Sequence, residues 1–156
     1  MLTSESPIST ADGRRAAMAL LAQGEMAEIA DGLAAFAGPL RYVELRPAAT
    51  GLVMLRGRIG GDGAPFNLGE ATVTRAAVRM ESGEVGFSYL LGRDQKRARL
   101  AAVCDALWQR ADSRDAIERH VLAPIKARVE RERAQKRSEA AATRVDFFTL
   151  VRGEDE

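Results

Sequence analysis

Arginine is the residue with the clearest chemical potential in this sequence, because it recurs in segments that predict β-strands. Arg75 and Arg79 lie four residues apart in a segment rich in threonine and valine, so both side chains project from one face of a strand. Arg93 directly follows another predicted strand. Since guanidinium groups bind phosphate oxygens through paired N–H donors, these three residues are a candidate anion-binding site. The alternatives are a solvated sheet face, or arginines that pair with carboxylates of a partner.

Further arginines lie on neighbouring predicted strands. Arg56 and Arg58 share a face of the preceding strand, and Arg46 lies one strand further along the chain. If the strand register brings these positions together, guanidinium groups would cover one side of the sheet.

Other reactive residues are few. The single cysteine, Cys104, lies within an apolar helical stripe, which favours a core thiol over a nucleophile. The single histidine, His120, has no recognisable catalytic partner and is interpreted as a surface or interface residue. Asp94 is placed to cap a helix, and the glycine-rich stretch 60–63 lacks a P-loop pattern and predicts a turn. We therefore expect neither a metal site nor a cofactor in this chain, and we find no catalytic constellation in its sequence.

The elements that would position these residues follow from periodicity and turn signals. Helical patterns and strand patterns occupy separate parts of the chain. We expect helices at 14–21, 25–36, 93–110, 115–122 and 124–142, and strands at 40–46, 51–59, 71–80 and 84–91. Short connections between the strands predict an antiparallel meander. The fold class is thus α+β, a four-stranded antiparallel sheet with flanking helices and a helical C-terminal arm.

The helix expected at 93–110 carries an apolar stripe at i, i+3, i+4, i+7 and i+8, formed by Leu100, Val103, Cys104, Leu107 and Trp108. We expect this stripe to cover the apolar face of the sheet. In the strand expected at 84–91, alternation places Val85, Phe87, Tyr89 and Leu91 on one face.

Composition limits the class of protein. The 156 residues are 46% apolar, and 23 basic against 22 acidic residues give a net charge of +1. That balance argues against a nucleic-acid-binding module, which usually shows a basic excess. No apolar run reaches the length of a membrane span, the first residues do not resemble a signal peptide, and one cysteine cannot form an intrachain disulfide. A cytoplasmic protein without membrane contact is expected.

The C-terminal part combines a charged helix with an apolar end. Residues 126–137 are almost entirely polar, yet residues 144–153 hold two of the five phenylalanines. This apolar segment either folds back on its own domain as a last strand or docks on a partner. The candidate interface residues are Arg144, Val145, Phe147, Phe148, Leu150 and Val151. We divide the chain into a flexible tail at 1–12, a core domain at 13–110, and an arm with this interaction segment at 111–156.

Several motifs in their order and spacing resemble the PhnG family, the G subunit of the carbon–phosphorus lyase system. They are TGLV at 50–53, GGDG at 60–63, GEATVTRAAVR at 69–79, GRD at 92–94 and RVDFFTLVRG at 144–153.

The resemblance implies a subunit of a core complex with H, I and J subunits, with which ATPase-like K and L subunits associate. It implies that the G, H, I and L subunits together transfer the ribose 5-triphosphate of MgATP onto methylphosphonate and release adenine. MgATP would thus be a substrate of the complex. The family supplies no catalytic residues for this subunit and places the catalytic centre in the I subunit. The resemblance also favours docking of the apolar segment on a partner. A purely architectural assembly protein without ligand contact is the alternative.

Overall fold

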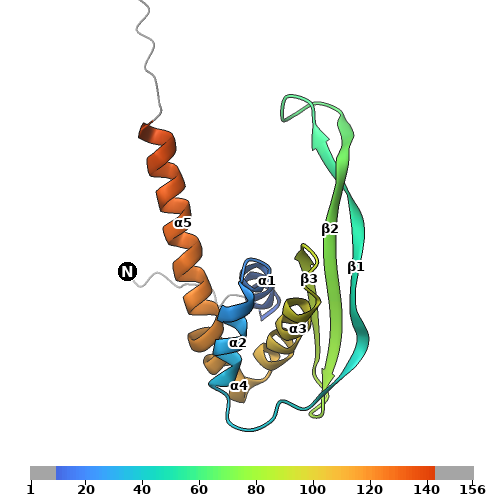
Figure 1. The fold of residues 1–156 in the computed structure, drawn as a ribbon, viewed down its shortest axis with the longest axis vertical. Helices are drawn as coiled ribbons and strands as arrows, with labels where there is room; N and C mark the ends of the chain where they lie inside the picture. The colour runs from blue at the N-terminus through green and yellow to red at the C-terminus, as the bar shows by residue number, and fades with distance from the viewer. Residues whose placement is uncertain (1–9, 143–156) are drawn as a thin grey trace, which may run out of the picture.

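The computed structural model describes residues 10–142, which form one sheet with helices on one face (Figure 1). The elements in chain order are α1 (Thr10–Leu21), α2 (Met26–Ala34), β1 (Tyr42–Arg58), β2 (Pro65–Met80), β3 (Val85–Leu91), α3 (Gln95–Gln109), α4 (Ala111–Ile117), the π-helical turn η1 (Glu118–Leu122) and α5 (Ala123–Ala142). The α+β class, the antiparallel meander and the C-terminal helix are confirmed. No helix within this described part is both long and apolar enough to cross a membrane.

The described part of the sheet has three strands in the order β1-β2-β3, so the prediction of four strands is wrong. The two strands expected at 40–46 and 51–59 are halves of β1, which pairs with β2 along its whole length. The residues between them, which include Pro47, are accommodated by register shifts between Glu44 and Arg46 and between Arg46 and Ala49. A β-bulge at a sheet edge tolerates proline because the missing N–H faces away from the ladder.

Helix α3 packs on the sheet through small residues. Its stripe is buried as expected, with Leu100 partly buried, and alanines such as Ala102 and Ala106 lie between the larger side chains. Gly86 of β3 lies so close to α3 that an added Cβ would clash with the carbonyl oxygen of Ala102. The alternate residues Phe87 and Tyr89 therefore project from the opposite, exposed face of the sheet.

Asp105 joins three elements of this core. Its carboxylate is 1% exposed and accepts hydrogen bonds from Nε and Nη2 of Arg14 in α1, at 2.9 and 2.7 Å. It also accepts one from the backbone N–H of Phe87 in β3, at 2.8 Å. This buried carboxylate fixes the position of α1 and β3 relative to α3.

Replacing Asp105 by alanine is expected to lower the free energy of unfolding by about 3 kcal/mol, because the variant leaves a guanidinium and a buried amide without their acceptor. Urea denaturation followed by circular dichroism measures the change. The exposed Asp115→Ala variant is the control and should differ from the parent by less than about 0.5 kcal/mol. Equal midpoints for the two variants would contradict this role of Asp105.

The C-terminal helices continue from the core into solvent. Ile117, Val121, Ile125 and Val129 belong to the buried core, whereas every residue from 130 to 142 is exposed. Helix α5 accordingly extends away from the body of the protein (Figure 1). The expectation of a solvated helix is confirmed from residue 130 onward, but Ile125 and Val129 at the base of α5 belong to the core, and the apolar segment 144–153 lies outside the described residues.

A charged pair anchors the base of α5 to α2. Arg128 donates from Nε and Nη2 to the two carboxylate oxygens of Glu28, at 2.8 and 2.9 Å, and from Nη2 to the carbonyl oxygen of Gln23 at 2.7 Å. These hydrogen bonds from Arg128 hold the pKa of Glu28 below its ordinary value of 4.5.

This anchor predicts a specific pH dependence. Because the pKa of Glu28 is lower in the folded state, its stabilising contribution is complete above about pH 4.5 and is lost as the pH falls through the folded-state value. Glu28→Gln should lower the free energy of unfolding at pH 7 by about 1 kcal/mol and flatten its decline between about pH 5 and pH 3. Urea midpoints measured across that range test this, and parallel curves for parent and variant would disprove it.

Candidate functional site

Three arginines meet on the exposed face of the sheet, which we name the arginine face (Arg46, Arg75 and Arg79). Arg75 and Arg79 project from the same face of β2. In β1, Arg46 pairs with Ala77, the residue midway between them, so its side chain joins that face. Strand geometry puts the Cα atom of Arg46 about 8 Å from those of the other two.

Aromatic side chains from β3 border this face. Tyr89 is the cross-strand partner of Arg75, and Phe87 is the partner of Ala77. Together with Leu45 and Arg46 they line a depression of about 560 Å³. Such a surface combines guanidinium donors with aromatic walls, which suits an anionic ligand that also has a planar or apolar part.

The guanidinium groups of the arginine face are unpaired in the part of the chain that the structure describes. Within residues 10–142, none of its three guanidinium groups makes an ion pair or a side-chain hydrogen bond. An incoming phosphate or carboxylate therefore displaces only water from these donors.

The structure places the other candidate arginines away from the arginine face. Arg56 and Arg58 pair with Asn67 and Pro65, at the far end of β1, so the register does not bring them to the arginine face. Arg93 is exposed in the connection between β3 and α3 and does not line the depression. The neighbouring Asp94 caps α3 as expected, since its carboxylate accepts a hydrogen bond from the Arg97 N–H at 2.8 Å.

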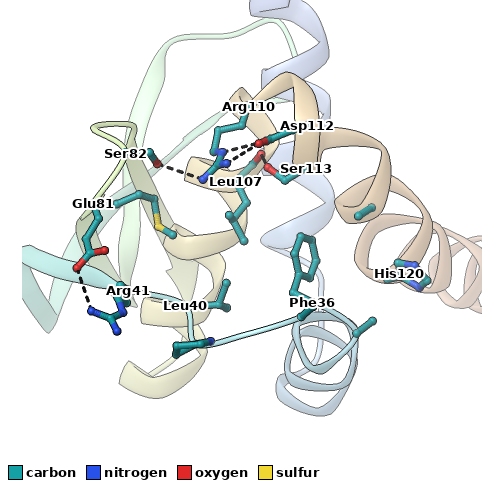
Figure 2. A pocket seen from close by; sticks show the side chains of 15 residues that line it. Phe36, Leu40, Arg41, Glu81, Ser82, Leu107, Arg110, Asp112, Ser113 and His120 are labelled. Carbon is teal, nitrogen blue, oxygen red and sulfur yellow. Dashed lines mark hydrogen bonds and ion pairs between the residues drawn. The ribbon is translucent and has the colours of Figure 1, made fainter.

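A second cavity, of about 590 Å³, lies where the turn between β2 and β3 approaches α4 and the connection from α2 to β1 (Figure 2). Phe36, Leu40 and Leu107 provide apolar walls, and the charged residues lie around them (Figure 2). Its arginines already have partners.

Arg110 donates to both oxygens of Asp112, at 3.0 and 2.5 Å, and to Ser82 at 3.2 Å. Arg41 lies 3.8 Å from Glu81. The pairing with Arg110 lowers the pKa of Asp112. An anion would have to compete with these carboxylates, so we favour the arginine face as the anion site although this second cavity is slightly larger.

Cys104 and His120 lie in the environments that the sequence predicts. Cys104 is fully buried, and burial raises the pKa of its thiol, so it is a core residue. His120 is exposed on η1 and lines the second cavity. Residues 10–142 contain no cluster of three side chains able to hold a metal ion.

Sequence reasoning missed the aromatic walls of the depression. The alternation Gly86-Phe87-Ser88-Tyr89 contains a signal for them, because small residues on one face of a strand allow a helix to pack closely there. The large residues between them must then face the other way.

The fold and the site together define a small α+β protein with an unpaired basic face on its sheet and a helix that extends into solvent. Residues 12–153 match the model of a family described as phosphonate metabolism protein PhnG, and the chain belongs to this family. The resemblance seen in the motifs is thereby confirmed. The chain is similar to a protein of Rhizobium meliloti (strain 1021) named alpha-D-ribose 1-methylphosphonate 5-triphosphate synthase subunit PhnG. The two are 51% identical over 142 residues, which cover 91% of this chain and 90% of the relative.

Proposed function

We propose that this chain is the G subunit of a complex that transfers the ribose 5-triphosphate of ATP onto methylphosphonate and releases adenine. The observation that carries the proposal is the 51% identity to a named synthase subunit over nearly the full length of both chains. By this proposal the chain works with H, I and L subunits, belongs to a core that also contains a J subunit, and has a K subunit among its associated proteins. MgATP is the substrate of the complex, and this chain holds no cofactor of its own.

The role of the chain within the complex is accessory, with catalysis located in another subunit. Its arm and C-terminal segment would attach it to a partner, and its arginine face would bind phosphate or phosphonate oxygens of the substrate. This second part of the role is supported because Arg46, Arg75 and Arg79 have no ion-pair partner among residues 10–142.

Reconstitution by omission tests the proposal. The candidate subunits are co-expressed with and without this chain, and adenine release from MgATP is measured with methylphosphonate present. Adenine should form only when the chain is included, and the purified chain alone should release none. Full turnover in its absence would refute the proposed function.

A further inference from the structure

The outer half of the β1–β2 hairpin extends beyond the rest of the fold, and we name it the distal ribbon (51–72). Six large apolar side chains project from it and are each between 41% and 66% exposed: Leu52, Met54, Leu55, Ile59, Phe66 and Leu68. They are more than half of the large exposed apolar residues of the described chain. Apolar side chains gathered in this way on one projection mark an interaction surface.

No described element covers the distal ribbon. The ladder between β2 and β3 begins at Val73 and Leu91, so the part of β2 before Val73 has β1 as its only strand neighbour in residues 10–142. Figure 1 shows the two strands continuing past the ends of β3 and α3. A two-stranded ribbon is only marginally stable in water, so this length of hairpin needs a surface to pack against.

The free edge of β1 differs between its two halves. Near Pro47 the register shifts protect the edge from pairing with another strand. From Ala49 to Leu55 the register is unbroken, and the stretch Thr50–Leu55 contains no charged residue and no proline. An edge without these protective features accepts an additional strand readily.

The side-chain pattern along this edge also predicts which partner strand would be complementary to it. Leu52, Met54 and Arg56 alternate on one face of β1. Within residues 10–142, the Arg56 guanidinium has no ion pair or side-chain hydrogen bond. A complementary strand would place apolar side chains opposite Leu52 and Met54 and a carboxylate opposite Arg56.

We propose that another subunit of the same complex covers the distal ribbon by adding a strand of this apolar and acidic pattern to the edge Thr50–Leu55. This inference rests on the proposed function, because the named relative is a subunit of a synthase and a complex supplies such a partner chain. Strand addition satisfies the free backbone groups of the edge, and the partner's side chains remove the apolar ones from water.

A matched pair of double variants tests the proposal in the co-expressed complex. Leu52→Glu/Met54→Glu alters side chains that are 62% and 52% exposed, and the control Val43→Glu/Leu91→Glu alters side chains outside the distal ribbon that are 52% and 68% exposed. The ribbon variant should lose co-purification with the other subunits, whereas the control should keep it. Both isolated chains should retain the circular dichroism spectrum of the parent.

Hydrogen exchange on the parent chain gives a second measurement that does not depend on the variants. The outward amides of Thr50–Leu55 should exchange at least about tenfold more slowly in the complex than in the isolated chain. Unchanged exchange, or assembly of the ribbon variant at parental stoichiometry, would overturn the proposal.

The same measurements distinguish two other polypeptides that could cover the distal ribbon. If the isolated chain forms a homodimer and the ribbon variant abolishes it, a second copy of the chain covers the distal ribbon. If the amides of Thr50–Leu55 are already protected in the isolated chain and lose this protection when residues 143–156 are removed, the chain's own C-terminal end covers it. Either result would overturn the proposal while leaving the proposed function intact. Failure of the parent chain itself to co-purify would instead count against the proposed function.

Discussion

Replacing Arg75 and Arg79 together by alanine should lower the kcat/KM of the reconstituted complex for MgATP by at least about 30-fold while leaving its assembly unchanged. A hydrogen bond to a charged group contributes about 1.5–3 kcal/mol, and the loss of about 2 kcal/mol corresponds to a 30-fold change. Both side chains are exposed, so their removal should not disturb the core. Initial rates of adenine release at varied MgATP and methylphosphonate concentrations measure the effect.

The double lysine variant Arg75→Lys/Arg79→Lys separates charge from geometry. Lysine keeps the positive charge but cannot donate two parallel hydrogen bonds, so activity should fall between that of the parent and that of the alanine variant. Arg93→Ala should have a smaller effect, because Arg93 lies in the connection between β3 and α3 and is not part of the arginine face. Unchanged kinetics in the double alanine variant would rule out anion binding at this face. Loss of assembly would show instead that the arginines pair with carboxylates of another subunit.

Part of this site could be predicted from sequence because strand alternation is local. The four-residue spacing of Arg75 and Arg79 is sufficient to place them on one face of β2. The position of Arg46 depends on pairing between strands, and two register shifts decide that it lies opposite Ala77. Such irregularities arise from the packing of the whole sheet, so the sequence could not separate Arg46 from Arg56 and Arg58.

The number of strands was mispredicted for a similar reason. Pro47 and Gly51 favour a turn when they are considered alone. In the structure the chain stays extended through both, because β2 offers a continuous partner from Pro65 to Met80. The length of that partner strand was itself underestimated, since the expected strand began only at Ala71.

An apolar pattern alone does not predict which face of the sheet is buried. In β3 the larger side chains, Phe87 and Tyr89, face outward, whereas Gly86 and Ser88 face α3. The face of β3 with the small residues is the buried one, because the alanines of α3 and the missing side chain of Gly86 allow the helix to pack closely on the strand. The exposed part of α5, residues 130–142, was predictable because its polar residues leave no apolar face to bury, whereas Ile125 and Val129 at the base of the helix are buried.

Deleting residues 144–156 is expected to abolish co-purification with the other subunits while the rest of the chain stays folded. The buried apolar residues of the described chain lie between Ala17 and Val129, before the deleted segment. Its apolar residues include Phe147 and Phe148, and burial of such side chains in a partner would contribute about 1.5–3 kcal/mol each. Pull-down of the co-expressed complex, with circular dichroism of the truncated chain, measures both parts of the prediction.

Two further variants show which property of the segment matters. Removing only the polar end, residues 153–156, should leave assembly intact, because that end contains no apolar side chain. Phe147→Ser/Phe148→Ser in the full-length chain should reproduce the loss caused by the larger deletion, since it removes the apolar contacts without shortening the arm. If both deletions assemble fully, the segment has no docking role. If the serine variant instead lowers the thermal stability of the isolated chain, the two phenylalanines belong to its own interior.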